Sequence, residues 1–431
     1  MKLTATPGGP LQGEAAIPGD KSCSHRALIL GAMAEGETRI SGLLESADVL
    51  ATAMGVEALG IDVDRAKGGE WLVRGGAWRA PVEAIDCGNS GTTARLLIGA
   101  VAGKPGLRAI FKGDSSLSSR PMQRVIGPLS RMGATFEGTD RLPLTVTGAR
   151  LGGIDLRGAP ISAQVKSAIL LAGLGTRADV SITEAVPSRD HSEIMLQLFG
   201  CEVAMADSPA GRTVTLGRQR VLKGRDIAIA SDPSSAAFPL VAAAITAGSE
   251  VAVRGMLVNP LRTGLYEILE SMGAAISLSN ERIRFGEIVA DMQLRHSALR
   301  PCHVKAEQVP AMIDEIPALA VSCALADGES VIEGLAEVRV KESDRLGAIV
   351  AGLTACGVSA AADGDTLRIF GRGRVRGGAR VATQGDHRIA MAFLTLGLAA
   401  EQPVEVDEAD MIGTSFPGFV EVMRSLGADI Q

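Results

Sequence analysis

The sequence is poor in aromatic residues and has no excess of basic ones. Of its 431 residues 3% are aromatic, Tyr266 is the only tyrosine, and the formal net charge is −6. Proteins that bind nucleic acid usually carry clustered positive charge, and those that bind single strands stack bases on aromatic rings. Both shortages argue against a nucleic-acid-binding protein, so any basic site must be local on an acidic chain.

Paired cysteines and long apolar runs are also missing. The six cysteines are scattered, with no CxxC pair and no histidine at metal-ligand spacing, so we expect free thiols in a reducing compartment and no metal. The opening MKLTATPGGP lacks the apolar segment of a signal peptide. No run approaches the roughly 18 apolar residues of a membrane span. We therefore expect a cytoplasmic protein. The cysteines are Cys23, Cys87, Cys201, Cys302, Cys323 and Cys356.

Nucleotide-binding and hydrolase motifs are absent as well. The segment GEAAIPGDKS is similar to a phosphate-binding loop, but five residues separate Gly13 from Gly19, and Asp20 intervenes before Lys21. The phosphate-binding loop has the pattern GxxxxGK[ST]. There is also no GxSxG and no HExxH. We expect no ATP site of this type and no cofactor.

A long internal repeat is present. Six times a helix-like apolar run ends in glycine before a β-like stretch, at intervals of about 70 residues that reach about 84 once. Glycine directly after a helix is typical of the left-handed cap, where a side chain would be strained. The endings are EALGIDV at Gly60, SRMGATF at Gly133, QLFGCEV at Gly200, ESMGAAI at Gly273, TACGVSA at Gly357 and RSLGADI at Gly427.

A second phrase, an Ala/Leu-rich helix followed by a turn and a strand, precedes each ending; HRALILGAMAEGETRI and SAAFPLVAAAITAGSEVAV are two examples. Because these helices are apolar nearly all round, we expect them to be buried. Each repeat reads helix, strand, helix, strand. The alternative is a solenoid scaffold without an active site, but solenoid repeats usually run about 20–50 residues. We favour two lobes of three repeats, divided near Ala230, with a cleft between them.

Cationic residues gather where the predicted helices begin. The start PGDKSCSHR places Lys21, Ser22 and Arg26 in the first turns, with Asp20 or Ser22 as cap. Helix amino termini favour anions, so cations there are unusual unless an anion lies between; for Lys21 alone a solvated cap is the alternative. SDPSSAAF, in the fourth repeat, has no cation at its first helix and is expected to be mostly architectural. The other starts carry Gly91 and Arg95, Arg120 and Arg124, Ser162, Gln164 and Lys166, Arg189, Lys341 and Arg345, and His387 and Arg388.

Acidic residues occur at two of these places. Asp314 and Glu315 stand in VPAMIDEIPALA, at the start of the fifth buried helix, and Glu342 stands beside Lys341. A carboxylate at the mouth of an apolar helix can act as a general acid or base if its surroundings shift its pKa. An ordinary helix cap is the alternative for Asp314.

These motifs, in this order, resemble the enolpyruvyl transferases, and among them the EPSP synthases, over essentially the whole chain. The segments are PGDKSCSHRALIL, GNSGTTARLL, SSRPM, SAQVKSA, VKESDRL and GDHRIAM. The resemblance implies an α/β fold: a two-lobed inside-out α/β barrel, each lobe three copies of a βαβαββ-type unit with helices inside and sheets outside. Residues 1–18 plus 230–431 would form a discontinuous lobe (repeats 4–6) and 19–229 the second (repeats 1–3), with the active site in the cleft between them.

The resemblance also implies a reaction and its residues. Phosphoenolpyruvate and shikimate 3-phosphate would be the substrates, glyphosate a possible inhibitor, and the enzyme a monomer. Asp314 would take the 5-hydroxyl proton, Glu342 would protonate the methylene carbon, and Lys21 would also be catalytic. The positions implied for shikimate 3-phosphate are Lys21, Ser22, Arg26, Ser162, Ala163, Gln164, Arg189, Asp314 and Lys341. Those implied for phosphoenolpyruvate are Lys21, Gly91, Arg120, Gln164, Arg345 and Arg388.

Three positions bear on the branch of the family. Leu96 stands where many glyphosate-sensitive members have proline, Gly91 stands where some tolerant members have alanine, and Thr414 stands where the enteric-type branch has a lysine. The nearest rival enzyme, the UDP-N-acetylglucosamine enolpyruvyl transferase, would need a loop cysteine, and GDSSLSSRPM has none. A non-catalytic repeat scaffold that binds anions is the other alternative.

Overall fold

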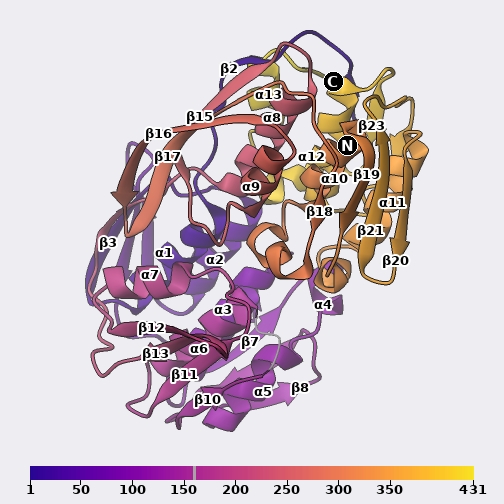
Figure 1. The fold of residues 1–431 in the computed structure, drawn as a ribbon. Helices are drawn as coiled ribbons and strands as arrows, with labels where there is room; N and C mark the ends of the chain where they lie inside the picture. The colour runs from indigo at the N-terminus through magenta and orange to yellow at the C-terminus, as the bar shows by residue number, and fades with distance from the viewer. Residues whose placement is uncertain (159–161) are drawn as a thin grey trace. The chain divides into compact units, whose positions relative to one another are not determined.

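The computed structural model describes residues 1–158 and 162–431, which form two compact units (Figure 1). Unit 1 comprises Met1–Pro18, Ala230–Ile283 and Glu287–Gln431. Unit 2 comprises Gly19–Ile229 and Arg284–Gly286. Each unit holds three of the six repeats.

Unit 2 contains the first three repeats. The first is α1 (Lys21–Met33), β3 (Gly36–Ser41), α2 (Ala47–Ala58), β4 (Asp62–Arg65) and β5 (Trp71–Gly75). The second is β6 (Ile85–Asp86), α3 (Gly91–Ala102), β7 (Arg108–Lys112), α4 (Ser115–Ser119), α5 (Gln123–Met132), β8 (Thr135–Gly138) and β9 (Leu144–Thr147). The third is β10 (Ile154–Leu156), α6 (Ala163–Gly173), β11 (Val180–Glu184), α7 (His191–Leu198), β12 (Val203–Ser208) and β13 (Gly211–Leu216), and β14 (Asp226–Ala228) follows it.

Unit 1 contains the last three repeats. The fourth is β2 (Gln12–Glu14), α8 (Pro233–Ile245), β15 (Glu250–Leu257), α9 (Gly264–Ser271), β16 (Ala275–Arg284) and β17 (Glu287–Arg295). The fifth is β18 (His303–Val304), the 3-10 helix η1 (Ala306–Met312), α10 (Ile316–Leu325), β19 (Asp327–Ile332), η2 (Ala336–Val340), α11 (Arg345–Ala355), β20 (Ser359–Asp363) and β21 (Thr366–Arg372). The sixth is β22 (Arg380–Val381), α12 (His387–Ala399), β23 (Val404–Val406), η3 (Ala409–Thr414), α13 (Phe419–Ser425), β24 (Asp429–Ile430) and β1 (Leu3–Thr6).

Among the residues that the structure describes, the strands form six sheets of four strands each, all with one topology. An edge strand runs parallel to the strand that follows the first helix. The last strand of the repeat pairs antiparallel with the other side of that strand, and the strand before the last pairs antiparallel with the last, as in the order β10-β11-β13-β12. Three of these sheets recruit strands from far along the chain. In unit 2, β14 pairs with β3, and in unit 1, β2 pairs with β15 while β1 lies between β23 and β24.

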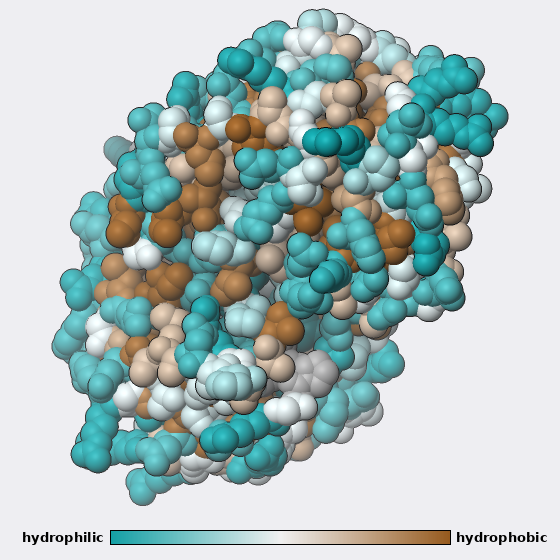
Figure 2. Space-filling model, viewed as in Figure 1, coloured by the Kyte–Doolittle hydropathy of each residue, from teal (hydrophilic) through white to brown (hydrophobic). Residues whose placement is uncertain are grey.

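The helices lie inside and the sheets outside, which confirms the predicted inside-out α/β fold. Every residue of α8 is buried, and so is every residue of α12 except the last. The strands instead alternate buried and exposed residues, as β21 does, so one face of each sheet covers the helices. Figure 2 shows a face that is largely hydrophilic, with hydrophobic side chains in small groups.

The glycines of the repeat have the predicted conformation. Each of the six glycines follows the second helix of its repeat and has a positive φ, between 86° and 113°. This region is unfavourable for any residue that carries a side chain. At Gly133, for example, φ is 113° and the backbone N–H returns to the Leu129 carbonyl. The periodic glycine therefore marks the turn from the inner layer to the outer one.

No single helix in the described part of the chain has the length and apolar composition of a membrane span. One bent pair, η1 and α10, passes on length and composition alone.

Candidate active site

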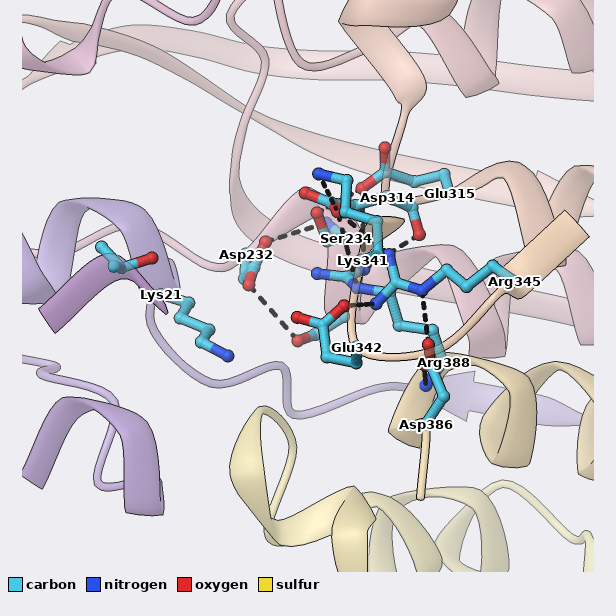
Figure 3. Close-up of polar contacts among 12 residues, drawn as sticks. Lys21, Asp232, Ser234, Asp314, Glu315, Lys341, Glu342, Arg345, Asp386 and Arg388 are labelled. Atoms are coloured by element: carbon cyan, nitrogen blue, oxygen red, sulfur yellow. Dashed lines mark hydrogen bonds and ion pairs between the residues drawn. The ribbon is translucent and has the colours of Figure 1, made fainter. Parts of the chain in front are cut away.

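In unit 1, Arg345 is the centre of a buried charge cluster at the starts of α11 and α12 (Figure 3). Its side chain has no exposed surface. Nε donates to Asp386 Oδ2 at 2.7 Å, NH1 to Asp314 Oδ1 at 3.3 Å, and NH2 to Glu342 Oε2. Burial opposes the charge, but Asp386, Glu342 and Asp314 outweigh it and raise the pKa of Arg345. The guanidinium thus holds Asp314 and Glu342, two of the three acids singled out in the sequence, in fixed places.

Two further cations face Asp314 in unit 1. Lys341 Nζ lies 3.6 Å from Asp314 Oδ1, and Arg388 Nε lies 4.0 Å from the same oxygen. Arg388 NH1 also donates to the Asp314 carbonyl oxygen at 3.2 Å. Glu315, not Asp314, occupies the cap position of α10, so the cap alternative for Asp314 is wrong. Asp314 is a partly exposed carboxylate among three cations.

The start of α8 does have a cation, which the sequence reading missed. Arg262, 2% exposed, donates from NH2 to Asp232 Oδ1 and to Ser234 Oγ, both at 3.0 Å. Ser234 Oγ in turn donates to Glu315 Oε1. Arg262 stands two residues before α9, just as Arg189 stands two residues before α7. This shared place in the repeat was the signal that could have found it.

In unit 2, α1 begins with its own carboxylates beside its cations. Asp20, one of the two residues predicted as the cap, is the cap, because its Oδ1 accepts from Cys23 N at 2.7 Å. Lys21 Nζ forms an ion pair with Asp48 Oδ2 at the start of α2. The sequence predicts an external anion beside a lysine at this place; the structure shows that Asp48 already supplies one negative charge. The Lys21 side chain is nonetheless 15% exposed.

Arg26 is held by three short hydrogen bonds within unit 2. Nε donates to Ser192 Oγ at 2.7 Å, NH2 to Ser167 Oγ at 2.7 Å, and NH1 to the Ser22 carbonyl oxygen at 2.9 Å. Burial lowers the pKa of Arg26. The structure therefore brings Ser22 and Arg26 together and fixes the guanidinium from α6 and α7.

The starts of α3 and α6 also meet in unit 2. Arg95 NH1 donates to Gln164 Oε1 at 2.8 Å, and Gln164 Nε2 donates to Thr92 Oγ1 at 2.9 Å. A Cβ on Gly91 would lie 2.5 Å from Arg95 NH1 and 3.4 Å from Arg120 NH1. Gly91, Arg120 and Gln164, predicted from the motifs, thus surround one helix start.

Of the remaining predicted residues, Ser162 and Ala163 lie at the start of α6. Arg189 follows a turn that is held by Glu184. Ser162 caps α6 by accepting from Val165 N, and Ala163 is its first residue. The turn before Arg189 is tied down by Ser188, whose N–H and hydroxyl both donate to the Glu184 carboxylate.

By its position in the sequence Lys166 is one of the helix-start cations, but it is not available to a ligand. Its side chain has no exposed surface and pairs with Glu184 and Glu193, both at 2.7 Å. Burial opposes its charge, but the Glu193 and Glu184 carboxylates outweigh it and raise the pKa of Lys166. Lys166 Nζ also donates to the Ser188 carbonyl oxygen at 3.3 Å, so it stabilises the turn before Arg189.

One buried group of side chains in unit 2 has the residue types of a metal site. The ligand atoms of Asp20, Cys23 and His191, all buried, lie within 4.8 Å of one another, a grouping that their spacing in the sequence did not predict. Asp20 is already used as the cap of α1, and the absence of a metal stays a prediction.

Thr414 Oγ1 donates to the Met411 carbonyl oxygen at 2.8 Å, which ties the hydroxyl to its own 3-10 helix.

Comparisons with known proteins agree over the whole chain. A sequence model of the family described as EPSP synthase (3-phosphoshikimate 1-carboxyvinyltransferase) matches residues 5–423. Proteins named 3-phosphoshikimate 1-carboxyvinyltransferase from Phenylobacterium zucineum and Caulobacter vibrioides are 54% and 50% identical, covering 99% of this chain and 95% and 98% of theirs. A solved EPSP synthase from Acinetobacter baumannii has a TM-score of 0.87 at 40% identity, over 100% of this chain and 99% of that one. The enolpyruvyl transferase NikO from Streptomyces tendae, at 21% identity and a TM-score of 0.78 over 100% and 98%, shares the fold.

Proposed function

This chain belongs to the EPSP synthase family, and we propose that the cations and carboxylates described above are its substrate-binding and proton-transfer groups. The chain is an enzyme that transfers the 1-carboxyvinyl (enolpyruvyl) group of phosphoenolpyruvate to the 5-hydroxyl of shikimate 3-phosphate, releasing phosphate. This is a step of the shikimate pathway toward aromatic amino acids.

The observation that carries the residue assignment is that one guanidinium, Arg345, contacts both Asp314 and Glu342. Addition needs one group to take a proton and another to give one, and carboxyls in different surroundings can divide these tasks. Asp314 lies among Lys341, Arg345 and Arg388, whereas Glu342 bonds Arg345 NH2. We assign Asp314 as the base and Glu342 as the acid.

The chemistry then balances in two steps. Asp314 takes the 5-hydroxyl proton of shikimate 3-phosphate while Glu342 gives a proton to the methylene carbon of phosphoenolpyruvate. The resulting cationic C2 is attacked by the 5-oxygen, which forms the tetrahedral intermediate. Glu342 then takes a proton back from the new methyl group as the C2–O bond to phosphate breaks, which releases the enol ether and phosphate. The departing phosphate or solvent takes the proton that Asp314 holds. Cations near the phosphate stabilise its leaving charge.

Polyanionic substrates explain why so many cations are needed. Two phosphorylated carboxylic acids repel each other, and charge-assisted hydrogen bonds from arginine and lysine offset that repulsion. For shikimate 3-phosphate we propose Lys21, Ser22, Arg26, Ser162, Ala163, Gln164, Arg189, Asp314 and Lys341. For phosphoenolpyruvate we propose Lys21, Gly91, Arg120, Gln164, Arg345 and Arg388, with Lys21 also assisting catalysis.

Three further properties are part of the proposal. The six cysteines are free thiols, which supports a reducing compartment such as the cytoplasm. We also propose that the enzyme acts as a monomer, which light scattering would test, and that glyphosate inhibits it.

Release of inorganic phosphate tests the activity directly. The purified enzyme should release phosphate from phosphoenolpyruvate plus shikimate 3-phosphate, and glyphosate should reduce the rate. A matched reaction with UDP-N-acetylglucosamine as acceptor should release none. If phosphate is released with the nucleotide sugar but not with shikimate 3-phosphate, the assignment of the acceptor is overturned. If no phosphate is released with either acceptor, a non-catalytic scaffold is favoured.

A further inference from the structure

Arg262 of the fourth repeat stands where the third repeat has Arg189, which we propose for substrate binding, but Arg262 is turned inward. Arg262 precedes α9 as Arg189 precedes α7, yet only 2% of it is exposed. Its NH2 group donates to Asp232 Oδ1 and to Ser234 Oγ at the start of α8. Arg262 therefore donates hydrogen bonds to residues of its own unit.

The direction of the Ser234 hydroxyl follows from this contact. A hydroxyl has one hydrogen to donate and two acceptor positions. Because Arg262 NH2 donates to Ser234 Oγ at 3.0 Å, it occupies an acceptor position and leaves the hydroxyl hydrogen for another partner. That partner is Glu315 Oε1, on a side chain that is 1% exposed. Arg262 thus makes Ser234 a donor toward Glu315.

Glu315 connects this pair to the proposed reacting groups. It directly follows Asp314 in the chain, and its Oε1 lies 4.0 Å from Arg388 NH1 (Figure 3). The same NH1 donates to the Asp314 carbonyl oxygen at 3.2 Å. Arg388 NH1 therefore contacts both Glu315 and the peptide of Asp314. A shift of the Glu315 carboxylate would move the Arg388 guanidinium and the Asp314 peptide together.

We propose that Arg262, Ser234 and Glu315 are positioning residues, which hold Arg388 and Asp314 in place for phosphoenolpyruvate binding and turnover. The inference rests on the proposed function, since it concerns the same site. The fourth repeat then contributes to catalysis through these three residues, although it has no predicted substrate contact. Buried hydrogen-bonded networks of this kind fix geometry because each member satisfies the next.

Ser235 provides a matched control for Ser234. It is the next residue of α8, it is also buried, and its hydroxyl donates to Asp232 Oδ2 at 3.5 Å rather than to Glu315. Ser234→Ala and Ser235→Ala each remove one buried hydroxyl from the same helix turn. They differ in whether the chain of contacts to Arg388 is broken.

The experiment is steady-state kinetics of phosphate release, with shikimate 3-phosphate affinity measured separately by calorimetry. For Ser234→Ala we expect KM for phosphoenolpyruvate to rise about tenfold and kcat to fall about tenfold, the size of losing one hydrogen bond to a charged group. The Kd of shikimate 3-phosphate alone should change by less than about twofold, because most of its proposed partners do not contact Glu315. Ser235→Ala should leave all three values within about twofold.

A double-mutant cycle separates positioning from a general loss of stability. Glu315→Gln should raise KM for phosphoenolpyruvate as Ser234→Ala does, and the double variant should be no worse than Glu315→Gln alone, because both changes break one path. If Ser234→Ala does not fold, Arg262→Lys replaces it with the same expectation.

Two results would overturn the inference: equal kinetics for Ser234→Ala and Ser235→Ala, or multiplicative effects in the cycle. Failure of the proposed function would look different, since the unmodified enzyme itself would then release no phosphate.

Discussion

Arg345 Nε and Asp386 Oδ2 lie 2.7 Å apart, and neither side chain has any exposed surface. The same carboxylate caps α12, because Asp386 Oδ1 accepts from Arg388 N at 2.9 Å. One acid therefore orients two arginines of the proposed site, the first through its side chain and the second through its backbone.

Asp386 can be dissected because its two tasks respond to different substitutions. Asp386→Asn keeps a good helix cap but removes the charge beside Arg345, and we expect a loss of about 3 kcal/mol of unfolding free energy. Asp386→Ala removes the cap as well and should cost about 1 kcal/mol more. Calorimetric unfolding measures both. Equal stability of Asn and Ala variants would show that the cap contributes nothing.

Asp314→Asn and Glu342→Gln should each lower turnover by about 10²- to 10⁴-fold, the usual contribution of a positioned acid or base. Shikimate 3-phosphate should still bind, since the amides keep the shape of the side chains. Rapid-quench kinetics and calorimetry measure the two quantities. Glu421→Gln, at an exposed acid of α13, is the control. Turnover near that of the control in both variants would remove the two acids from the mechanism.

Arg26→Lys should weaken shikimate 3-phosphate binding about tenfold or more, because lysine cannot reproduce three hydrogen bonds of a planar guanidinium. The bonds at stake join Ser192, Ser167 and the Ser22 carbonyl oxygen. Calorimetry against Arg39→Lys, a change at an exposed arginine of β3, isolates the effect. Unchanged affinity would exclude Arg26 from the site.

Gly91→Ala should raise KM for phosphoenolpyruvate about tenfold, since the new Cβ would displace Arg95 NH1 and so the hydrogen bond to Gln164. Gly127→Ala is the matched control, because its Cβ would meet Gln123 Nε2 at an ordinary 3.8 Å. Titration with glyphosate on both variants tests the expectation, based on resemblance, that alanine at 91 gives tolerance. A KM equal to that of the control would mean that Arg95 moves without consequence.

His25 should make unit 2 less stable in acid. Burial first, and Lys21 and Arg26 next, hold its pKa well below the ordinary value. The unfolded chain binds a proton near pH 6.5 and the folded one does not, so stability falls as the pH drops below about 6.5, by up to about 1.4 kcal/mol per pH unit.

Tryptophan fluorescence during urea unfolding reports on this unit, since Trp71 and Trp78 both lie in it. Comparison of His25→Gln with the unmodified protein between pH 7.5 and 5 should show a shallower slope for the variant. Parallel slopes would mean that His25 binds its proton equally in both states.

The repeat made much of the fold predictable. Periodic glycines such as Gly133 and apolar helices such as α8 are local signals, because one residue's φ or one helix's composition carries each of them. The charged residues were harder. Lys21 and Lys166 both stand near helix starts, yet Lys166 is enclosed by Glu184 and Glu193 and Lys21 stays partly exposed. Which acids enclose a lysine depends on packing between elements, which the local sequence does not encode.

Arg262 shows the same limit from the other side. Its position in the repeat could be seen in the sequence. The inward direction of its side chain, however, depends on contacts with Asp232 and Ser234, which lie about one helix and one strand earlier in the chain. Motif resemblance supplied Asp314 and Arg388 directly. The residues that hold them were found only when the distances were known.

The strand pairing also constrains the order in which the units can be completed during synthesis. In unit 2, β14 joins β3, so the described sheets of that unit have all their strands once residue 228 is made. In unit 1, Leu3 of β1 pairs with Val406 of β23, and at about 5–20 residues per second the first strand waits on the order of 20–80 s for its partner. β1 is thus made before the other described strands and is among the last of them to be paired, and until then its edge is open to chaperones or to other nascent chains.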